Sequence, residues 1–259
     1  MATDVWDPTQ YLRFADERLR PALDLLARVP LQAPARVVDL GCGPGNVTAI
    51  LKQRFPAAAV TGVDASAAML VKARAAAPDC GFVAGDFFTW TPEQPPDLIF
   101  SNAALHWVSG HEALFPRLLS LLAPGGVLAV QIPAMQAAPL RTLQYEVAAN
   151  GPWAERLRGV TSSPPILSPG AYWDLLRPRA AMLDMWETIY MHALAGENAV
   201  GEWSSGSGLR PFLDALPPEQ RASFRAAFDA AVAPHYPRRA DGTTLLPFRR
   251  LFMVARVSQ

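Results

Sequence analysis

Short apolar runs alternate with amphipathic segments through the middle of the chain. Runs of four to six residues that lack polar alternation are typical of strands buried on both faces of a sheet. Strands that alternate with helices predict an α/β fold with a parallel, doubly wound sheet. The strands are expected at residues 37–40, 60–64, 82–86, 97–100 and 127–132, and the intervening helices near 47–54, 67–77 and 110–122.

The pattern changes after Pro133. Helices are expected at 139–150, 169–176, 197–215 and 218–233, and two late strands at 183–194 and 251–257. A late antiparallel strand at one edge would complete a Rossmann-like sheet of seven strands that is otherwise mostly parallel. We therefore expect one domain over residues 1–259, with an N-terminal helical lid at 1–30, a cofactor-binding core at 31–133, and helical insertions that cover the active site at 134–182 and 196–245.

Composition narrows the classes of partner. The 23 basic and 23 acidic residues cancel, so no global field favours nucleic acid or an anionic membrane. No apolar stretch reaches the length that crosses a bilayer. The chain has only two cysteines, which gives neither a disulfide framework nor a metal-binding spacing. We expect a cytoplasmic protein with no metal, no nucleic acid and no membrane partner.

Three glycines at alternate positions, Gly41, Gly43 and Gly45, follow the first strand directly. Without a Cβ, Gly41 and Gly43 can take positive φ and let a ligand lie against the main chain. Dinucleotide folds use the spacing G-x-G-x-x-G, whereas this chain has G-x-G-x-G after Asp39. That form is the usual opening of S-adenosylmethionine (SAM) methyltransferases, and Cys42 occupies a place where a small residue fits. A turn that serves only strand-to-helix packing is the alternative.

Two further acids follow at strand ends. Asp64 lies 25 residues beyond Asp39, and a carboxylate at that place can accept hydrogen bonds from both hydroxyls of a ribose. It can also serve as a plain helix N-cap. The next strand ends in Gly85-Asp86-Phe87. In the SAM class such an Asp accepts a hydrogen bond from the adenine amino group and the next residue offers its backbone amide to the ring, whereas the NAD fingerprint contains no such acid.

The predicted cofactor residues stand at the ends of four strands. Open α/β sheets bind their ligands at this edge. The set consists of Asp39, Gly41, Cys42, Gly43, Asp64, Ala65, Met69, Gly85, Asp86, Phe87 and Asn102.

With these motifs in place, the chain resembles the class I SAM-dependent methyltransferases, and within them most closely the trans-aconitate 2-methyltransferase family. The segments Gly208-Leu209-Arg210-Pro211 and 250–256 carry the narrower resemblance. Residues 134–165 depart from the family pattern, and His106 stands where the family has glutamine. Further segments that resemble this family are 11–14, 25–30, 39–46, 114–116 and 128–131.

The resemblance implies that the sulfonium methyl of SAM is transferred to one carboxylate of the tricarboxylate trans-aconitate, giving a monomethyl ester and S-adenosylhomocysteine. A carboxylic acid titrates near pH 4, so the acceptor is already an anion at neutral pH. We therefore expect positioning and desolvation with no catalytic base. An arginine bound to the reacting carboxylate would draw charge from the attacking oxygen and weaken it as a nucleophile. Arg210 and Arg250 are therefore expected to bind the non-reacting carboxylates. The predicted substrate residues are Tyr11, His106, Trp107, Gln131, Arg210 and Arg250.

Three alternatives remain open at this point. The methyl acceptor can be another small metabolite, either a different carboxylic acid or a hydroxyl or carbon acceptor, and the latter would need a base such as His106. The chain can be an NAD-dependent oxidoreductase, although the glycine spacing and Asp86 argue against it. It can also bind SAM without turning it over.

Overall fold

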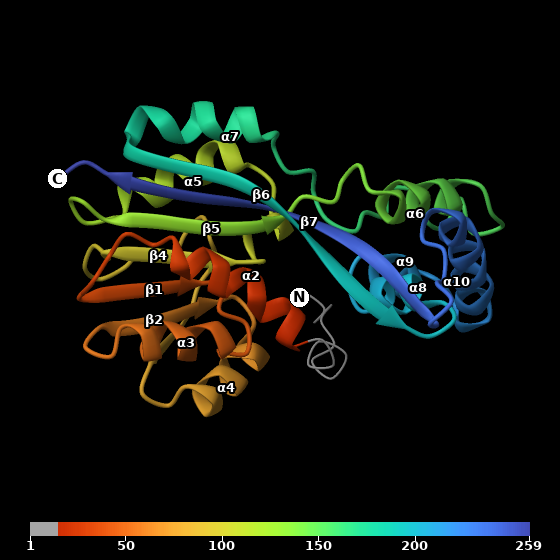
Figure 1. The fold of residues 1–259 in the computed structure, drawn as a ribbon, viewed down its shortest axis with the longest axis horizontal. Coiled ribbons are helices and arrows are strands. Elements are labelled where there is room, and N and C mark those ends of the chain that lie inside the picture. Colours follow the sequence, from red (N-terminus) through yellow and green to blue (C-terminus); the bar gives the residue numbers. More distant parts are fainter. Residues whose placement is uncertain (1–14) are drawn as a thin grey trace. The chain divides into compact units, whose positions relative to one another are not determined.

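A computed structural model describes the fold of residues 15–259, and one sheet of seven strands organises it (Figure 1). The strand order is β3-β2-β1-β4-β5-β7-β6. The strands β1 to β5 pair in parallel, whereas β7 pairs with β5 in the antiparallel direction. The predicted mostly parallel sheet with a late antiparallel strand is therefore confirmed. The bounds are β1 (Arg36–Leu40), β2 (Ala59–Asp64), β3 (Gly81–Ala84), β4 (Leu98–Asn102), β5 (Val127–Pro133), β6 (Ala180–Ala195) and β7 (Thr243–Val257).

The central strands are buried along their whole length. In β5 every residue except Pro133 is buried, and β4 is buried up to Ser101. Helices on both faces remove both sides of a parallel strand from water, which explains the unbroken apolar runs in the sequence. The connecting elements are α3 (Asn46–Arg54), α4 (Ala67–Ala76), η1 (Leu105–Trp107) and α5 (His111–Ser120), and α2 (Ala15–Ala27) precedes the sheet.

The described chain divides into two compact units. The sheet unit comprises residues 18–133, 166–188 and 250–259, and the helical unit includes 134–165 and 189–249. The expected insertion at 134–182 is thereby shared between them, since α7 (Pro169–Leu176) belongs to the sheet unit. Tyr172 of α7 is fully buried, and its hydroxyl lies 2.5 Å from Nδ1 of His111. A role of the insertions as an active-site cover stays a prediction.

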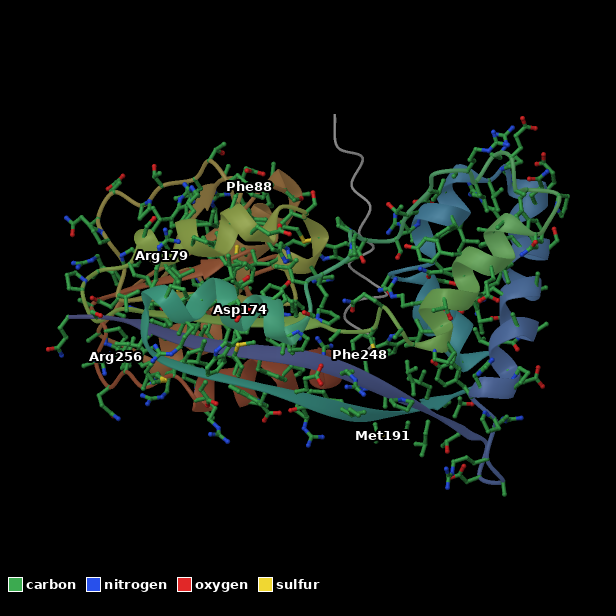
Figure 2. The ribbon with its side chains drawn as sticks, turned by 90° about the horizontal axis from the view of Figure 1, so that it is seen from above. Phe88, Asp174, Arg179, Met191, Phe248 and Arg256 are labelled. Carbon is green, nitrogen blue, oxygen red and sulfur yellow. The ribbon has the colours of Figure 1, made fainter. Side chains whose placement is uncertain are left out.

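The helical unit has an aromatic core of its own. Phe212, Phe224 and Phe228 are fully buried, and Trp153 meets Phe224 edge to face at 5.2 Å between ring centroids. Figure 2 shows α6, in green, beside α10, in blue, and labels Phe248, which packs into the same core from β7. The helices are α6 (Pro139–Ala149), α8 (Ala199–Ser205), α9 (Arg210–Ala215) and α10 (Pro218–Val232), with the 3-10 turns η2 (Arg177–Arg179) in the sheet unit and η3 (Ala233–His235) here.

The helices of residues 15–259 are all too short or too polar to cross a membrane.

Candidate active site

The glycine turn after β1 meets two other loops. Gly41 and Gly45 have φ of +79° and +86°. A Cβ on Gly41 would lie 2.3 Å from the Ala104 Cβ and 3.3 Å from the Phe87 ring, and a Cβ on Gly45 would lie 2.8 Å from the Ala73 backbone. These two glycines are therefore required by close packing as well as by backbone conformation. The turn following β1 thus lies against the loops that follow β3 and β4.

Gly43 differs from its neighbours in the turn. Its φ is +53°, and a Cβ built there would meet no atom within 4 Å among the residues that the structure describes. Its amide donates a 2.8 Å hydrogen bond to Oδ2 of Asp64. A bare backbone with open space in front of it is what a ligand needs in order to approach the main chain.

Asp64 ties the ends of β1 and β2 together. Its second oxygen, Oδ1, accepts a 2.8 Å bond from the Ser66 amide. The side chain that caps α4 is that of Ser66, which accepts from the Met69 amide at 3.3 Å. The carboxylate of Asp64 is thus held at the strand end by two amides and is not the cap of the helix. Of its predicted neighbours, Ala65 is exposed and Met69 is buried.

Asp39 is a buried carboxylate within β1. It is 1% exposed, and its Oδ2 accepts a 2.6 Å hydrogen bond from the Thr48 hydroxyl. Burial raises the pKa of Asp39 from 3.8 to about 7, the Thr48 hydrogen bond opposes this rise, and the charge of Asp64 adds to it. Burial likewise raises the pKa of the neighbouring Cys42 thiol above its ordinary range, which makes it a poor nucleophile.

The loop after β3 is fixed from α5. The exposed Asp86 accepts the Phe88 amide at 2.8 Å, which closes a turn around Phe87. Arg117 donates to the carbonyl oxygens of Phe87, at 3.3 Å, and Trp90. Sequence reasoning missed this arginine and also Thr48, because neither stands in a motif. The available signal is that each is a polar residue on a predicted helix: Thr48 bonds Asp39 of β1, and Arg117 bonds the loop after β3.

The end of β4 has a strained backbone and a buried hydrogen-bond acceptor without a donor among the described residues. Ala103 has φ of +52°, and among the described residues it is the one non-glycine with positive φ. Such strain clusters at functional positions. The preceding Asn102 has a buried Oδ1 that finds no hydrogen-bond partner within residues 19–259. His106 and Trp107 follow in η1; the first is buried, the second is 38% exposed, and their ring centroids lie 4.5 Å apart.

A polar row crosses the same edge of the sheet. Asn102 pairs in register with Gln131, and Gln131 pairs with Phe252. Side chains alternate along a strand, so Arg250 shares the sheet face of Phe252 and Gln131. Nη1 of Arg250 donates a 3.2 Å hydrogen bond to Oε1 of Gln131, and the two residues are 4% and 0% exposed. The sheet unit therefore presents a buried guanidinium beside the end of β5.

Arg210 belongs to the helical unit. It begins α9, and its Nε donates a 3.3 Å hydrogen bond to Asp214 one turn later. Its Nη1 is buried and has no hydrogen-bond partner in the part of the chain described. Tyr11 lies outside the described residues. Within residues 19–259 no three His, Cys, Asp or Glu side chains form a group that could hold a metal ion.

The chain is similar to known proteins both in sequence and in fold. Residues 37–126 match the family model described as a methyltransferase domain. The trans-aconitate 2-methyltransferase of Methylobacterium radiotolerans is 52% identical over 97% of this chain and 98% of its own, and that of Paracidovorax citrulli is 51% identical over 98% of each. The crystal structure of the YcgJ protein from Bacillus subtilis superposes with a TM-score of 0.62 at 14% identity, over 93% of this chain and 99% of its own, which shows a shared fold. The chain belongs to the trans-aconitate 2-methyltransferase family.

Proposed function

We propose that this protein transfers the methyl group of SAM to one carboxylate of trans-aconitate, with the monomethyl ester and S-adenosylhomocysteine as products. The observation that carries the proposal is identity of about half the residues, over nearly the whole chain, to proteins named trans-aconitate 2-methyltransferase. The methyltransferase domain match over residues 37–126 supports the same reaction class.

The residues at the sheet edge fit SAM. The open backbone at Gly43, the fixed carboxylate of Asp64 and the buried Oδ1 of Asn102 offer, respectively, close approach, hydroxyl recognition and an acceptor for an ammonium group. SAM when bound supplies an electrophilic methyl on a cationic sulfur. We assign Asp64 to the ribose, Asp86 and Phe87 to the adenine, and the turn at Gly41 and Gly43 to the amino-acid end.

The acceptor requires little chemistry from the protein. A carboxylate is ionised at neutral pH, so no group has to remove a proton from it. The task of the protein is to strip water from the carboxylate and to hold one oxygen in line with the methyl group, at roughly 3 to 3.5 Å. Buried donors that grip the other carboxylates accomplish this without drawing charge from the reacting oxygen.

Arg250 is our candidate for such a donor in the sheet unit. Gln131 accepts from Nη1 and thereby fixes the plane of the guanidinium. A planar fork held in this way suits bidentate binding of a carboxylate. Arg210 is proposed for the same chemistry in the helical unit, while His106 and Trp107 are proposed as non-basic walls of the acceptor site.

The experiment that tests the function is direct. The purified protein is incubated with SAM and, separately, with trans-aconitate, cis-aconitate, citrate and isocitrate, and methyl esters are detected by mass spectrometry. The proposal expects an ester of trans-aconitate. It also expects that, as the pH is lowered from about 8 to 5.5, the rate shows no decrease of the kind that protonation of a histidine base would cause. Failure to esterify any acid would leave only the family assignment standing, and a steep acid limb would favour a base-requiring acceptor.

A further inference from the structure

The helical unit contains an arginine that no ion pair explains. Arg141, on α6, has a buried Nη1 with no hydrogen-bond partner among the residues described, and no carboxylate in that part of the chain pairs with it. Burial lowers the pKa of Arg141 below its ordinary value. An unpaired buried guanidinium destabilises a folded protein, so a functional reason for its presence is required.

Arg225 in the same unit shows what a structural arginine looks like. Its Nε donates to both oxygens of Asp229, at 2.9 and 3.0 Å, and its Nη1 lies 3.7 Å from Glu202. Its guanidinium also bonds Ser205. This guanidinium is compensated by two acids, whereas that of Arg141 is not.

The position of Arg141 is fixed by two contacts of α6. A Cβ built on Gly208 would lie 1.9 Å from Nη1 of Arg141, so the guanidinium rests directly on the Gly208 backbone. One turn further along α6, Tyr145 meets Phe212 edge to face at 5.5 Å. Residues four apart share one helix face, so this face of α6 packs along the segment from Gly208 to Phe212.

This contact also explains the Gly-Leu-Arg-Pro segment. Its glycine makes room for the Arg141 guanidinium, and its arginine, Arg210, stands two residues later with a buried Nη1 that also lacks a hydrogen-bond partner within residues 19–259. Two cationic donors at one short segment, with Asp214 on only one of them, form a place for an anion.

We propose that Arg141 and Arg210 form a carboxylate-binding site within the helical unit, and that Arg141 holds one non-reacting carboxylate of the acceptor. The proposal rests on the proposed function and adds a residue that sets its specificity for a tricarboxylate. No covalent step is involved, because both arginines bind and orient the acceptor and neither exchanges a proton with it.

The test compares Arg141→Met with Arg156→Met, a matched change at an exposed arginine of the same unit. For Arg141→Met we expect the KM for trans-aconitate to rise about 10- to 100-fold, the value of one charge-assisted hydrogen-bonded pair. SAM affinity by calorimetry is unchanged, and the melting temperature without ligand is equal to or above that of the wild type, since an uncompensated charge has been removed. Arg156→Met changes none of these quantities.

Two further variants sharpen the result. Arg141→Lys keeps the positive charge but loses the planar, forked guanidinium, so its KM for trans-aconitate is expected to lie between those of the wild type and Arg141→Met. Gly208→Ala pushes its Cβ into the space of Nη1, so it raises the KM in the same sense although it leaves Arg141 in the chain.

Three dicarboxylates, mesaconate, itaconate and cis-glutaconate, each lack a different carboxylate of trans-aconitate, and their inhibition constants identify the one that Arg141 holds. Arg141→Met weakens two of them and leaves unchanged the one that lacks that carboxylate. An unchanged KM for trans-aconitate, equal weakening of all three inhibitors, or a lowered melting temperature with a matching loss of kcat would each overturn the proposal. Absence of ester from the wild type would refute the function instead, and trans-aconitate protection against melting then still decides the role of Arg141.

Discussion

Asp39→Asn is expected to stabilise the ligand-free protein, and to do so more at high pH. The carboxyl group is 1% exposed and has a pKa of about 7 in the folded protein against 3.8 for an ordinary aspartate. A carboxyl whose pKa is raised on folding binds its proton more tightly in the folded state. Its contribution to stability is therefore fully present below pH 3.8 and is lost as the pH rises to about 7.

The magnitude follows from the two pKa values. Each decade in proton affinity corresponds to about 1.4 kcal/mol, so ionised Asp39 costs the folded state about 4 kcal/mol at most above pH 7. Asparagine keeps an oxygen for the Thr48 hydroxyl and has no charge to desolvate. The free energy of unfolding of Asp39→Asn minus that of the wild type is thus expected to widen by about 2 to 3 kcal/mol between about pH 5 and pH 8, and to stop widening above that.

Urea unfolding of both proteins across this range measures the difference, with Asp79→Asn, a change at an exposed aspartate, as the control. The difference between the two proteins is used because it cancels the pH effects that they share. Urea unfolding is followed separately in the two units, since the chain has more than one compact unit. A difference that is constant from pH 5 to pH 8 would show that Asp39 does not titrate in this range and would refute the reasoning.

Three other changes test the cofactor edge and the acceptor chemistry. Asp64→Ala removes the carboxylate that accepts hydrogen bonds from two backbone amides. It is expected to weaken SAM binding about 10- to 100-fold by calorimetry, and unchanged affinity would contradict its ribose role. Gly45→Ala forces a Cβ to 2.8 Å from the Ala73 backbone at φ +86°, so it should lower the free energy of unfolding by about 2 to 4 kcal/mol. A Cβ at Gly43 meets no atom of the described chain within 4 Å. Gly43→Ala should therefore lower the free energy of unfolding by only about 1 kcal/mol and mainly reduce SAM affinity. His106→Gln should keep kcat/KM for trans-aconitate within about threefold from pH 5.5 to 8.5, and loss of activity at every pH would revive a base mechanism.

The sheet and its cofactor edge were predictable because local pattern determines them. Unbroken apolar runs follow from burial of both faces of a strand, and the glycines of the turn follow from the positive φ at Gly41, Gly43 and Gly45. The parallel order follows from the alternation of strands with helices. The late antiparallel strand was also foreseen, although β7 begins at Thr243 rather than near residue 251. Its first half lies in the helical unit, where no sheet alternation marks it in the sequence.

The contacts that give side chains their roles were not predictable. Whether Arg250 reaches Gln131 depends on the register of β7 on β5, which pairs residues about 120 positions apart in the chain and leaves no local trace. The same is true of Arg141, which lies in the region where the sequence departs from the family pattern. An arginine on an amphipathic helix usually points to solvent, and only the close approach to Gly208 shows that this one does not.

On the proposed assignment, the charged groups at the sheet edge and in the helical unit are opposite in sign to the ligand groups that they would bind. At the glycine turn of the sheet unit, Asp39 is a buried carboxylate whose pKa is raised further by the charge of Asp64, and SAM carries positive charge on its sulfonium and ammonium groups. In the helical unit the groups are cations, Arg141 and Arg210, and the acceptor is a trianion. On this assignment each charge costs stability in the ligand-free protein and would be compensated when its ligand binds. The proposed assignment thereby concentrates binding energy on ligands of the correct sign, so that selection of a tricarboxylate for methylation would require no catalytic base.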